Sequence, residues 1–210
     1  MGIIGFSSGS VGRMGNVDRM VQAILDKSGR PSEFVKLTDL QFSGCKGCVE
    51  LCAKPLECRL DDDAMPYYAR IKKADAIVLG APVYFSSPNT TMLAFLERFF
   101  GFRHVRIAVK DKPVVVVLSA RGPRESARVQ FLARIAPFEM NVIDVVFFES
   151  HVYPCYRCGY HKVCTIGGLY RDIAEEAFLV KITPDLFKVW EDQPKMVQAI
   201  DAAAEKLKAV

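Results

Sequence analysis

The sequence contains no apolar run that approaches the roughly 20 residues needed to span a bilayer. Its N-terminus lacks a basic segment followed by a long apolar stretch, so we expect no secretory signal. Lys and Arg number 28 against 24 Asp and Glu, without a long run of one charge, and a net charge of +4 is too weak to indicate nucleic-acid binding. We therefore expect a soluble cytoplasmic protein with neither a membrane nor a nucleic-acid partner.

Two common catalytic motifs are also missing. No Gly-Lys-Ser/Thr follows the glycine-rich N-terminal loop, as a P-loop would require, and no Gly-x-Ser-x-Gly elbow supports a serine nucleophile. The 210 residues, of which 50% are hydrophobic, are enough for one domain with a sizeable core. We expect that domain over residues 1–150, with a cysteine-rich insertion at 40–62 and an extension at 151–210 packed on the same domain.

Apolar segments of strand length alternate with segments of helical periodicity along most of the chain. The expected strands are residues 3–6, 33–37, 76–80, 113–118 and 142–148, and the expected helices begin near residues 17, 64, 89, 126 and 193. Strands that read as continuous apolar runs and alternate with helices indicate a parallel sheet covered on both faces. The sequence therefore predicts an α/β fold with a doubly wound, five-stranded parallel sheet.

Three polar loops follow expected strands and should meet at the carboxyl edge of this sheet, where doubly wound folds bind ligands. Residues 7–16 are small and polar and precede a helix, so their backbone N–H groups and hydroxyls favour a phosphate. Residues 81–88 carry an aromatic pair that suits a flat ring. Residues 119–123 form the third loop. An ordinary βα turn remains the alternative for the first.

The cysteines fall into two groups. Four of the seven lie within one short stretch and can converge on one metal centre: Cys45, Cys48, Cys52 and Cys58. An iron–sulfur cluster, a zinc ion and thiol or disulfide chemistry all fit such a stretch, and Gly44 and Gly47 permit the tight backbone that a cluster needs. The other three, Cys155, Cys158 and Cys164, could form a zinc site or a second cluster with His151 or His161, or remain unligated.

Two of the loops resemble those of the flavodoxin-like NAD(P)H-dependent FMN reductases. Residues 9–17 are similar to the Gly-Ser-Pro-Arg-x-x-Ser/Gly-Asn-Thr loop of that family, and residues 81–86 with 92–98 resemble its Pro-Val/Ile-Tyr-Phe/Trp-Gly/Ser…Met-Lys-x-Phe-Ile/Leu-Asp-Arg segment. Together with a compact cysteine motif, they resemble one branch, the iron–sulfur flavoproteins. The cysteine spacing here, Cys-x2-Cys-x3-Cys-x5-Cys, is one residue longer than the pattern of that branch.

The resemblance implies a flavodoxin-like fold, bound FMN and a [4Fe–4S] cluster held by the first cysteine group. It implies that the FMN phosphate is held by Ser10, Arg13, Asn16 and Val17, with Ser8 also in contact with the flavin. It implies that the ring is lined by Pro82, Val83, Tyr84, Phe85 and Ser86 and flanked by Ser119, Ala120, Arg121 and Gly122. Gly12 stands where the family has an arginine, so Arg13 supplies the charge one position later; Val11, Val17 and Leu93 also replace the family's proline, threonine and lysine.

We therefore expect an FMN-dependent oxidoreductase that passes electrons between a ferredoxin-like donor or NAD(P)H and a small-molecule acceptor. The cysteine loop follows the second expected strand, where it can lie over the end of the sheet at which FMN would bind. The resemblance implies a homodimer or homotetramer in which the cluster of one subunit approaches the flavin of another. One alternative is an NAD(P)H-dependent FMN or quinone reductase with structural zinc. The other is a non-enzymatic flavodoxin-like binding module.

Overall fold

The computed structural model describes residues 2–122 and 125–210, so Pro123 of the expected third loop lies outside the described residues. Five parallel strands form the sheet in the order β2-β1-β3-β5-β6. Their bounds are β1 (Ile3–Ser7), β2 (Ser32–Lys36), β3 (Ala76–Tyr84), β5 (Pro113–Ala120) and β6 (Asn141–Glu149). The predicted parallel sheet is confirmed, but it has six strands and not five, because a two-residue strand, β4 (Ser87–Pro88), pairs antiparallel with the end of β3.

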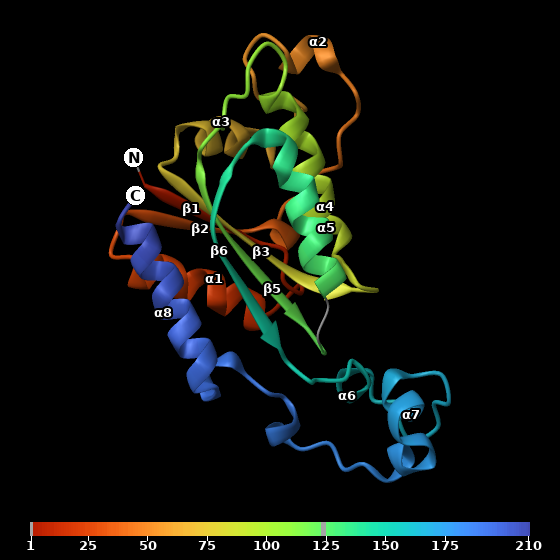
Figure 1. The fold of residues 1–210 in the computed structure, drawn as a ribbon. Coiled ribbons are helices and arrows are strands. Elements are labelled where there is room, and N and C mark those ends of the chain that lie inside the picture. The colour runs from red at the N-terminus through yellow and green to blue at the C-terminus, as the bar shows by residue number, and fades with distance from the viewer. Residues whose placement is uncertain (1, 123–124) are drawn as a thin grey trace.

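Helices cover both faces of the sheet, as the alternation of apolar patterns predicts (Figure 1). On one face lie α1 (Asn16–Lys27) and α8 (Pro194–Lys208), whose apolar residues share one core with the sheet. On the other lie α3 (Met65–Lys73), α4 (Thr90–Glu97) and α5 (Glu125–Ile135), around an aromatic core that includes Phe95 and Phe99. Within the part of the chain that the structure describes, no helix is long and apolar enough to cross a membrane.

One strand is longer than the sequence predicts. Strand β3 extends past residue 80 to Tyr84, because its last residues turn back into the short hairpin with β4. Helix α4 ends at Glu97 and continues as the 3-10 helix η2 (Arg98–Phe102). The remaining short elements are α2 (Val49–Cys52), α6 (Cys155–Cys158), α7 (Gly168–Ile173), η1 (Leu37–Asp39), η3 (Ala136–Phe138), η4 (Ala174–Leu179), η5 (Pro184–Leu186) and η6 (Trp190–Asp192).

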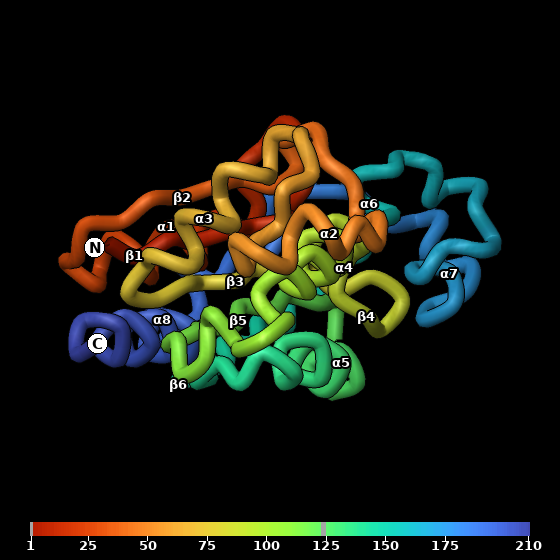
Figure 2. The backbone as a smooth tube through the Cα atoms, turned by 90° about the horizontal axis from the view of Figure 1, so that it is seen from above, coloured from red at the N-terminus to blue at the C-terminus, as the bar shows by residue number. Residues whose placement is uncertain are grey.

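The segment between β6 and α8 projects from the carboxyl edge of the sheet. It carries α6 and α7 and lies on the side of the molecule away from both termini, as two perpendicular views show (Figures 1 and 2). The chain then returns to the sheet, and α8 packs against α1 and β6. The strand order reverses between β1 and β3, so the loops after these two strands meet at a topological switch point.

Candidate functional site

A pocket of about 200 Å³ lies at this switch point. It is lined by six of the residues that the sequence singles out for flavin binding: Ser10, Arg13, Asn16, Val17, Pro82 and Ser119. The first four come from the loop after β1 and the first turn of α1, and Pro82 and Ser119 come from β3 and β5. Backbone N–H groups at the N-terminus of a twelve-residue helix favour an anion there.

A fully buried carboxylate, Asp18, shapes the loop after β1. One of its oxygens accepts a 2.6 Å hydrogen bond from the Ser7 hydroxyl, and the other accepts the backbone N–H of Gly15 at 2.7 Å. The ammonium of Lys36 lies 3.2 Å from Asp18 and offsets its charge beside a site that favours anions. Sequence reasoning missed Asp18, although Gly15 followed three residues later by an acidic side chain matches the spacing of a helix capping box.

Ser8 lies outside the pocket. Its hydroxyl is buried and donates a 2.6 Å hydrogen bond to the side-chain oxygen of Asn89, while the Asn89 amide donates to the Ser8 carbonyl at 2.8 Å. Asn89 also caps α4 through the N–H of Met92. Ser8 thus connects the loop after β1 to the start of α4.

The β3–β4 hairpin places four of the five expected ring-lining residues, Val83 to Ser86, beyond the pocket, whereas Pro82 lines it. Val83 and Tyr84 pair with β4, and Phe85 and Ser86 form the turn with positive φ angles of 49° and 65°. Phe85 is fully exposed at the tip. The Ser86 carbonyl accepts hydrogen bonds from two α5 side chains, Ser126 and Gln130, which fix the turn against α5.

The loop after β5 is bound to the extension. Arg121 forms an ion pair with Asp172 of α7 at 2.5 Å, and its guanidinium lies 4.8 Å from the centre of the Tyr153 ring. The Ala120 carbonyl accepts hydrogen bonds from the backbone and the hydroxyl of Ser150. Ser119 lines the pocket, whereas Ala120, Arg121 and Gly122 do not.

The extension contributes pocket residues that sequence reasoning missed. They are Ser150, Val152, Arg157, Phe187, Lys188 and Val189. The Asn16 side-chain amide donates to the Lys188 carbonyl at 3.1 Å, which joins residues far apart in the sequence. No local motif marks these positions, because only the path of the chain after β6 brings them to the switch point.

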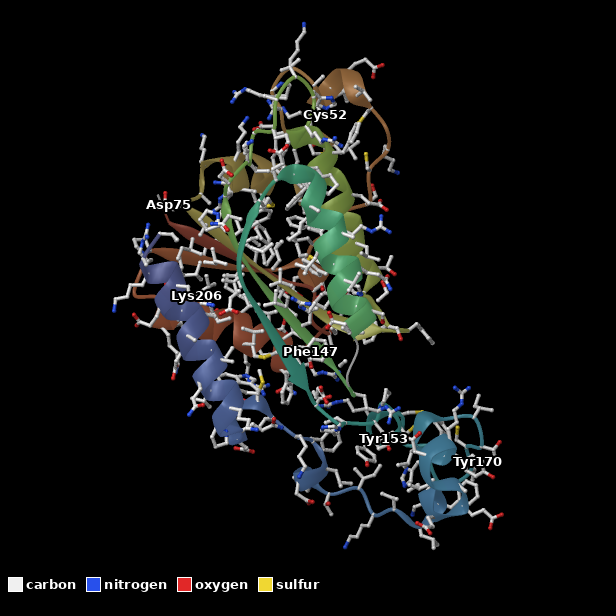
Figure 3. All side chains as sticks on the ribbon, in the orientation of Figure 1. Cys52, Asp75, Phe147, Tyr153, Tyr170 and Lys206 are labelled. Carbon is white, nitrogen blue, oxygen red and sulfur yellow. The ribbon has the colours of Figure 1, made fainter. Side chains whose placement is uncertain are left out.

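The first cysteine group does not lie over the end of the sheet that carries the switch-point pocket, so that interpretation is wrong for a single chain. The backbone at Ser43 and Gly44 passes the first half of α4, but α2 packs against η2, at the far end of α4. Because α4 starts at the carboxyl edge of the sheet and runs back, its far end lies at the opposite edge. Figure 3 shows Cys52 and Tyr153, which precedes the second group, at opposite ends of the molecule.

A buried arginine causes this placement. Arg98 is 1% exposed, and its guanidinium donates to the Cys58 sulfur at 3.1 Å and to both carboxylate oxygens of Asp62 at 2.7 and 2.8 Å. It also donates to the carbonyls of Ser43 and Leu60, and thereby fastens both ends of the cysteine loop to η2. An unpaired buried guanidinium would be costly, so these contacts determine where the loop lies.

The four thiols of this loop fit an iron–sulfur cluster or zinc by their type and number. Burial and then the neighbouring sulfurs of Cys48, Cys58 and Cys45 raise the pKa of the Cys52 thiol. Nε2 of His104 lies 3.1 Å from the Cys52 sulfur. Among residues 2–122 and 125–210, no three His, Cys, Asp or Glu side chains gather at metal-coordination distance, so the fit rests on the donor set.

In the second cysteine group, two sulfurs converge on one glycine. A methyl group at Gly167 would lie 2.9 Å from the Cys155 sulfur and 3.3 Å from the Cys164 sulfur. Cys155 and Cys158 occupy the two ends of α6, one helical turn apart. His161 is buried, with Nε2 2.9 Å from the Val180 carbonyl and without a partner for Nδ1 in the described structure.

Residues 1–151 match the family described as NADPH-dependent FMN reductase. The chain belongs to this family. It is 33% identical over 132 residues to an iron–sulfur flavoprotein of Methanocaldococcus jannaschii, which covers 60% of this chain and 67% of that protein. It is 28% identical over 148 residues to an iron–sulfur flavoprotein of Methanosarcina thermophila, and this match covers 69% of this chain and 76% of that protein. These relatives confirm the branch of the FMN reductase family that the loops and cysteines indicate.

A solved structure supports the fold of this FMN reductase family member. Two-electron reduced flavodoxin of Megasphaera elsdenii superimposes with a TM-score of 0.51 at 13% sequence identity, covering 97% of this chain and 98% of flavodoxin. The flavodoxin-like α/β fold is therefore confirmed. The match to the FMN reductase family identifies the protein as an FMN-dependent oxidoreductase.

Proposed function

We propose that this FMN-dependent oxidoreductase is an electron-transfer flavoprotein that also carries a [4Fe–4S] cluster. It passes electrons between a ferredoxin-like donor or NAD(P)H and a small-molecule acceptor. The observation that carries the proposal is the loop of four cysteines, anchored by a buried arginine, in a chain whose relatives are named iron–sulfur flavoproteins. Those names support the cluster; the donor and acceptor rest on the family resemblance.

In this proposal the pocket at the switch point receives the phosphate of FMN. Ser10, Arg13 and Asn16 offer it a hydroxyl, a guanidinium and an amide, and Val17 contributes its backbone N–H at the start of α1. Pro82–Ser86 and Ser119–Gly122 would hold the flavin ring. Bound flavin supplies the capacity to exchange one or two electrons.

The cluster would be held by Cys45, Cys48, Cys52 and Cys58 and supply one-electron transfer. The Arg98 guanidinium donates a hydrogen bond to the Cys58 sulfur and so holds this proposed ligand in place. His104 contributes a further polar contact at Cys52. Polar groups that contact ligating sulfurs orient them and tune the reduction potential.

We also propose that the second cysteine group binds a metal, with Cys155, Cys158 and Cys164 as ligands and His161 as the fourth. Two features support this: the convergence of two sulfurs on Gly167 and the buried, unpartnered Nδ1 of His161. Three thiolates and one imidazole suit zinc, and a second iron–sulfur centre is the alternative.

Anaerobic purification tests the main proposal. We expect a yellow-brown protein with FMN and about four irons held by the first cysteine loop. Cys48→Ala should remove the broad iron–sulfur absorbance and leave FMN bound, because the pocket and the loop lie at opposite edges of the sheet. Cys158→Ala is the matched control and should keep that absorbance.

Other outcomes would decide against the proposal. Zinc with FMN and no iron would indicate a reductase with a structural metal. Neither flavin nor metal would indicate a binding module. Survival of the full iron absorbance in Cys48→Ala would show that the assigned ligands are wrong.

A further inference from the structure

Two arginines from distant parts of the chain line the same pocket. Arg13 lies in the loop after β1, and Arg157 lies on α6 of the extension. The side chains that line the pocket include no carboxylate. In the described ranges neither Arg13 nor Arg157 has an ion-pair partner, whereas Arg19, a third arginine at the pocket, is paired with Glu191.

Arg157 is held towards the pocket by its own surroundings. Its guanidinium lies 4.8 Å from the centre of the Phe187 ring, and Phe187 also lines the pocket. Its backbone N–H donates to the Pro154 carbonyl at 3.0 Å in the turn of α6. Burial, and then the positive charge of Arg13, lower the pKa of Arg157. Two cations that line one pocket without a counter-charge favour an anion in that pocket.

The extension is fastened to the loop that supplies Arg13. The Asn16 side chain donates to the Lys188 carbonyl at 3.1 Å, and the Arg19–Glu191 ion pair closes at 2.6 Å. Both contacts join the first turn of α1 to the segment around Phe187. The extension is therefore in place to supply a ligand to the pocket, and not only to cover it.

We propose that Arg157 binds the phosphate of FMN together with Arg13, so that the extension completes the phosphate site. This inference rests on the proposed function of the pocket. A phosphate monoester carries close to two negative charges, and the planar guanidinium matches its oxygens with paired hydrogen bonds. Gly12 leaves the loop without the arginine found there in the family pattern, and Arg157 supplies a second guanidinium from another part of the chain.

The test compares flavins with and without the phosphate. Apo-protein is titrated with FMN and with riboflavin, and binding is followed by quenching of flavin fluorescence. Arg157→Gln should raise the Kd for FMN by about 10- to 100-fold, the range for losing a charge-assisted hydrogen bond, and change that for riboflavin less than about twofold. Arg157→Lys should recover part of the FMN affinity, because it restores the positive charge without the paired N–H donors of the guanidinium.

The control is Arg171→Gln, which removes an exposed arginine of α7 in the same extension. It should leave both Kd values unchanged. Equal weakening of FMN and riboflavin by Arg157→Gln would show that Arg157 only supports the fold, and an unchanged Kd for FMN would exclude it as a ligand. A wild-type protein that binds riboflavin as tightly as FMN, or neither, would instead overturn the assignment of the pocket itself.

Discussion

At the scale of the residue, the proposed flavin pocket depends on a glycine that leaves room for a carboxylate. Gly9 lies against the buried Asp18 side chain, and a methyl group at this position would overlap its carboxylate. That carboxylate also accepts the Ser7 hydroxyl and the Gly15 N–H, so it cannot move away without breaking both bonds. The shape of the loop is therefore sensitive to one added carbon atom.

We predict that Gly9→Ala weakens FMN binding by at least tenfold and lowers the free energy of unfolding by about 1–3 kcal/mol, because the added methyl group displaces the buried, hydrogen-bonded carboxylate of Asp18. Gly15→Ala is the matched control, since its methyl group would meet Asp18 at an ordinary 3.5 Å. Flavin titration and thermal unfolding measure the two effects. An equal response of the two variants would contradict the role given to Gly9.

At the scale of the element, strands and helices follow from local sequence. Valine-rich residues 114–117 alone indicate a buried strand, and the periodicity from Val17 to Leu25 indicates a helix. The local sequence does not predict the position of the cysteine loop, because a loop between two strands can pass either edge of the sheet. Its position depends on Arg98, whose partners become visible only in the fold.

The same limit applies to the pocket. Six of the residues chosen from sequence line it, because loops after adjacent parallel strands must meet at one edge. Arg157 and Phe187 could not be predicted, since they reach the pocket through a segment with little regular structure. The β3–β4 hairpin, which carries Tyr84 and Phe85 beyond the pocket, was also not predicted.

The start of α7 offers a prediction for the second cysteine group. Gly167→Ala should crowd the Cys155 and Cys164 sulfurs and reduce bound metal in this group by at least half, because methyl contacts near 3 Å force the sulfurs apart. Gly168→Ala is its neighbour and control, as the added methyl group would meet only the Tyr153 ring at 3.8 Å. Metal analysis in a Cys48→Ala background measures this group alone. Unchanged metal in Gly167→Ala would exclude convergence at this glycine.

At the scale of the whole molecule, the two cysteine groups lie at different positions relative to the proposed flavin pocket. The second group shares α6 with Arg157, which lines the pocket. The first lies at the other edge of the sheet, beyond the far end of α4. The sheet and helices therefore lie between the first group and the proposed flavin site of its own chain, which favours an oligomer in which that group meets the flavin site of a neighbouring subunit.

Mixed oligomers test this arrangement. The Cys48→Ala variant loses the first thiol site. The Arg13→Gln, Arg157→Gln double variant loses the flavin phosphate site. Each variant alone should fail to transfer electrons from reduced ferredoxin to an acceptor. If electrons pass from the cluster site of one subunit to the flavin site of the other, a wild-type dimer has two such pairs of sites. Coexpression of the two variants in equal amounts makes half of the dimers mixed, and each mixed dimer has one intact pair. It should therefore restore about a quarter of the wild-type activity. Electron transfer within one chain predicts no recovery, since neither variant holds both sites. A single-subunit mass in light scattering would exclude the arrangement directly.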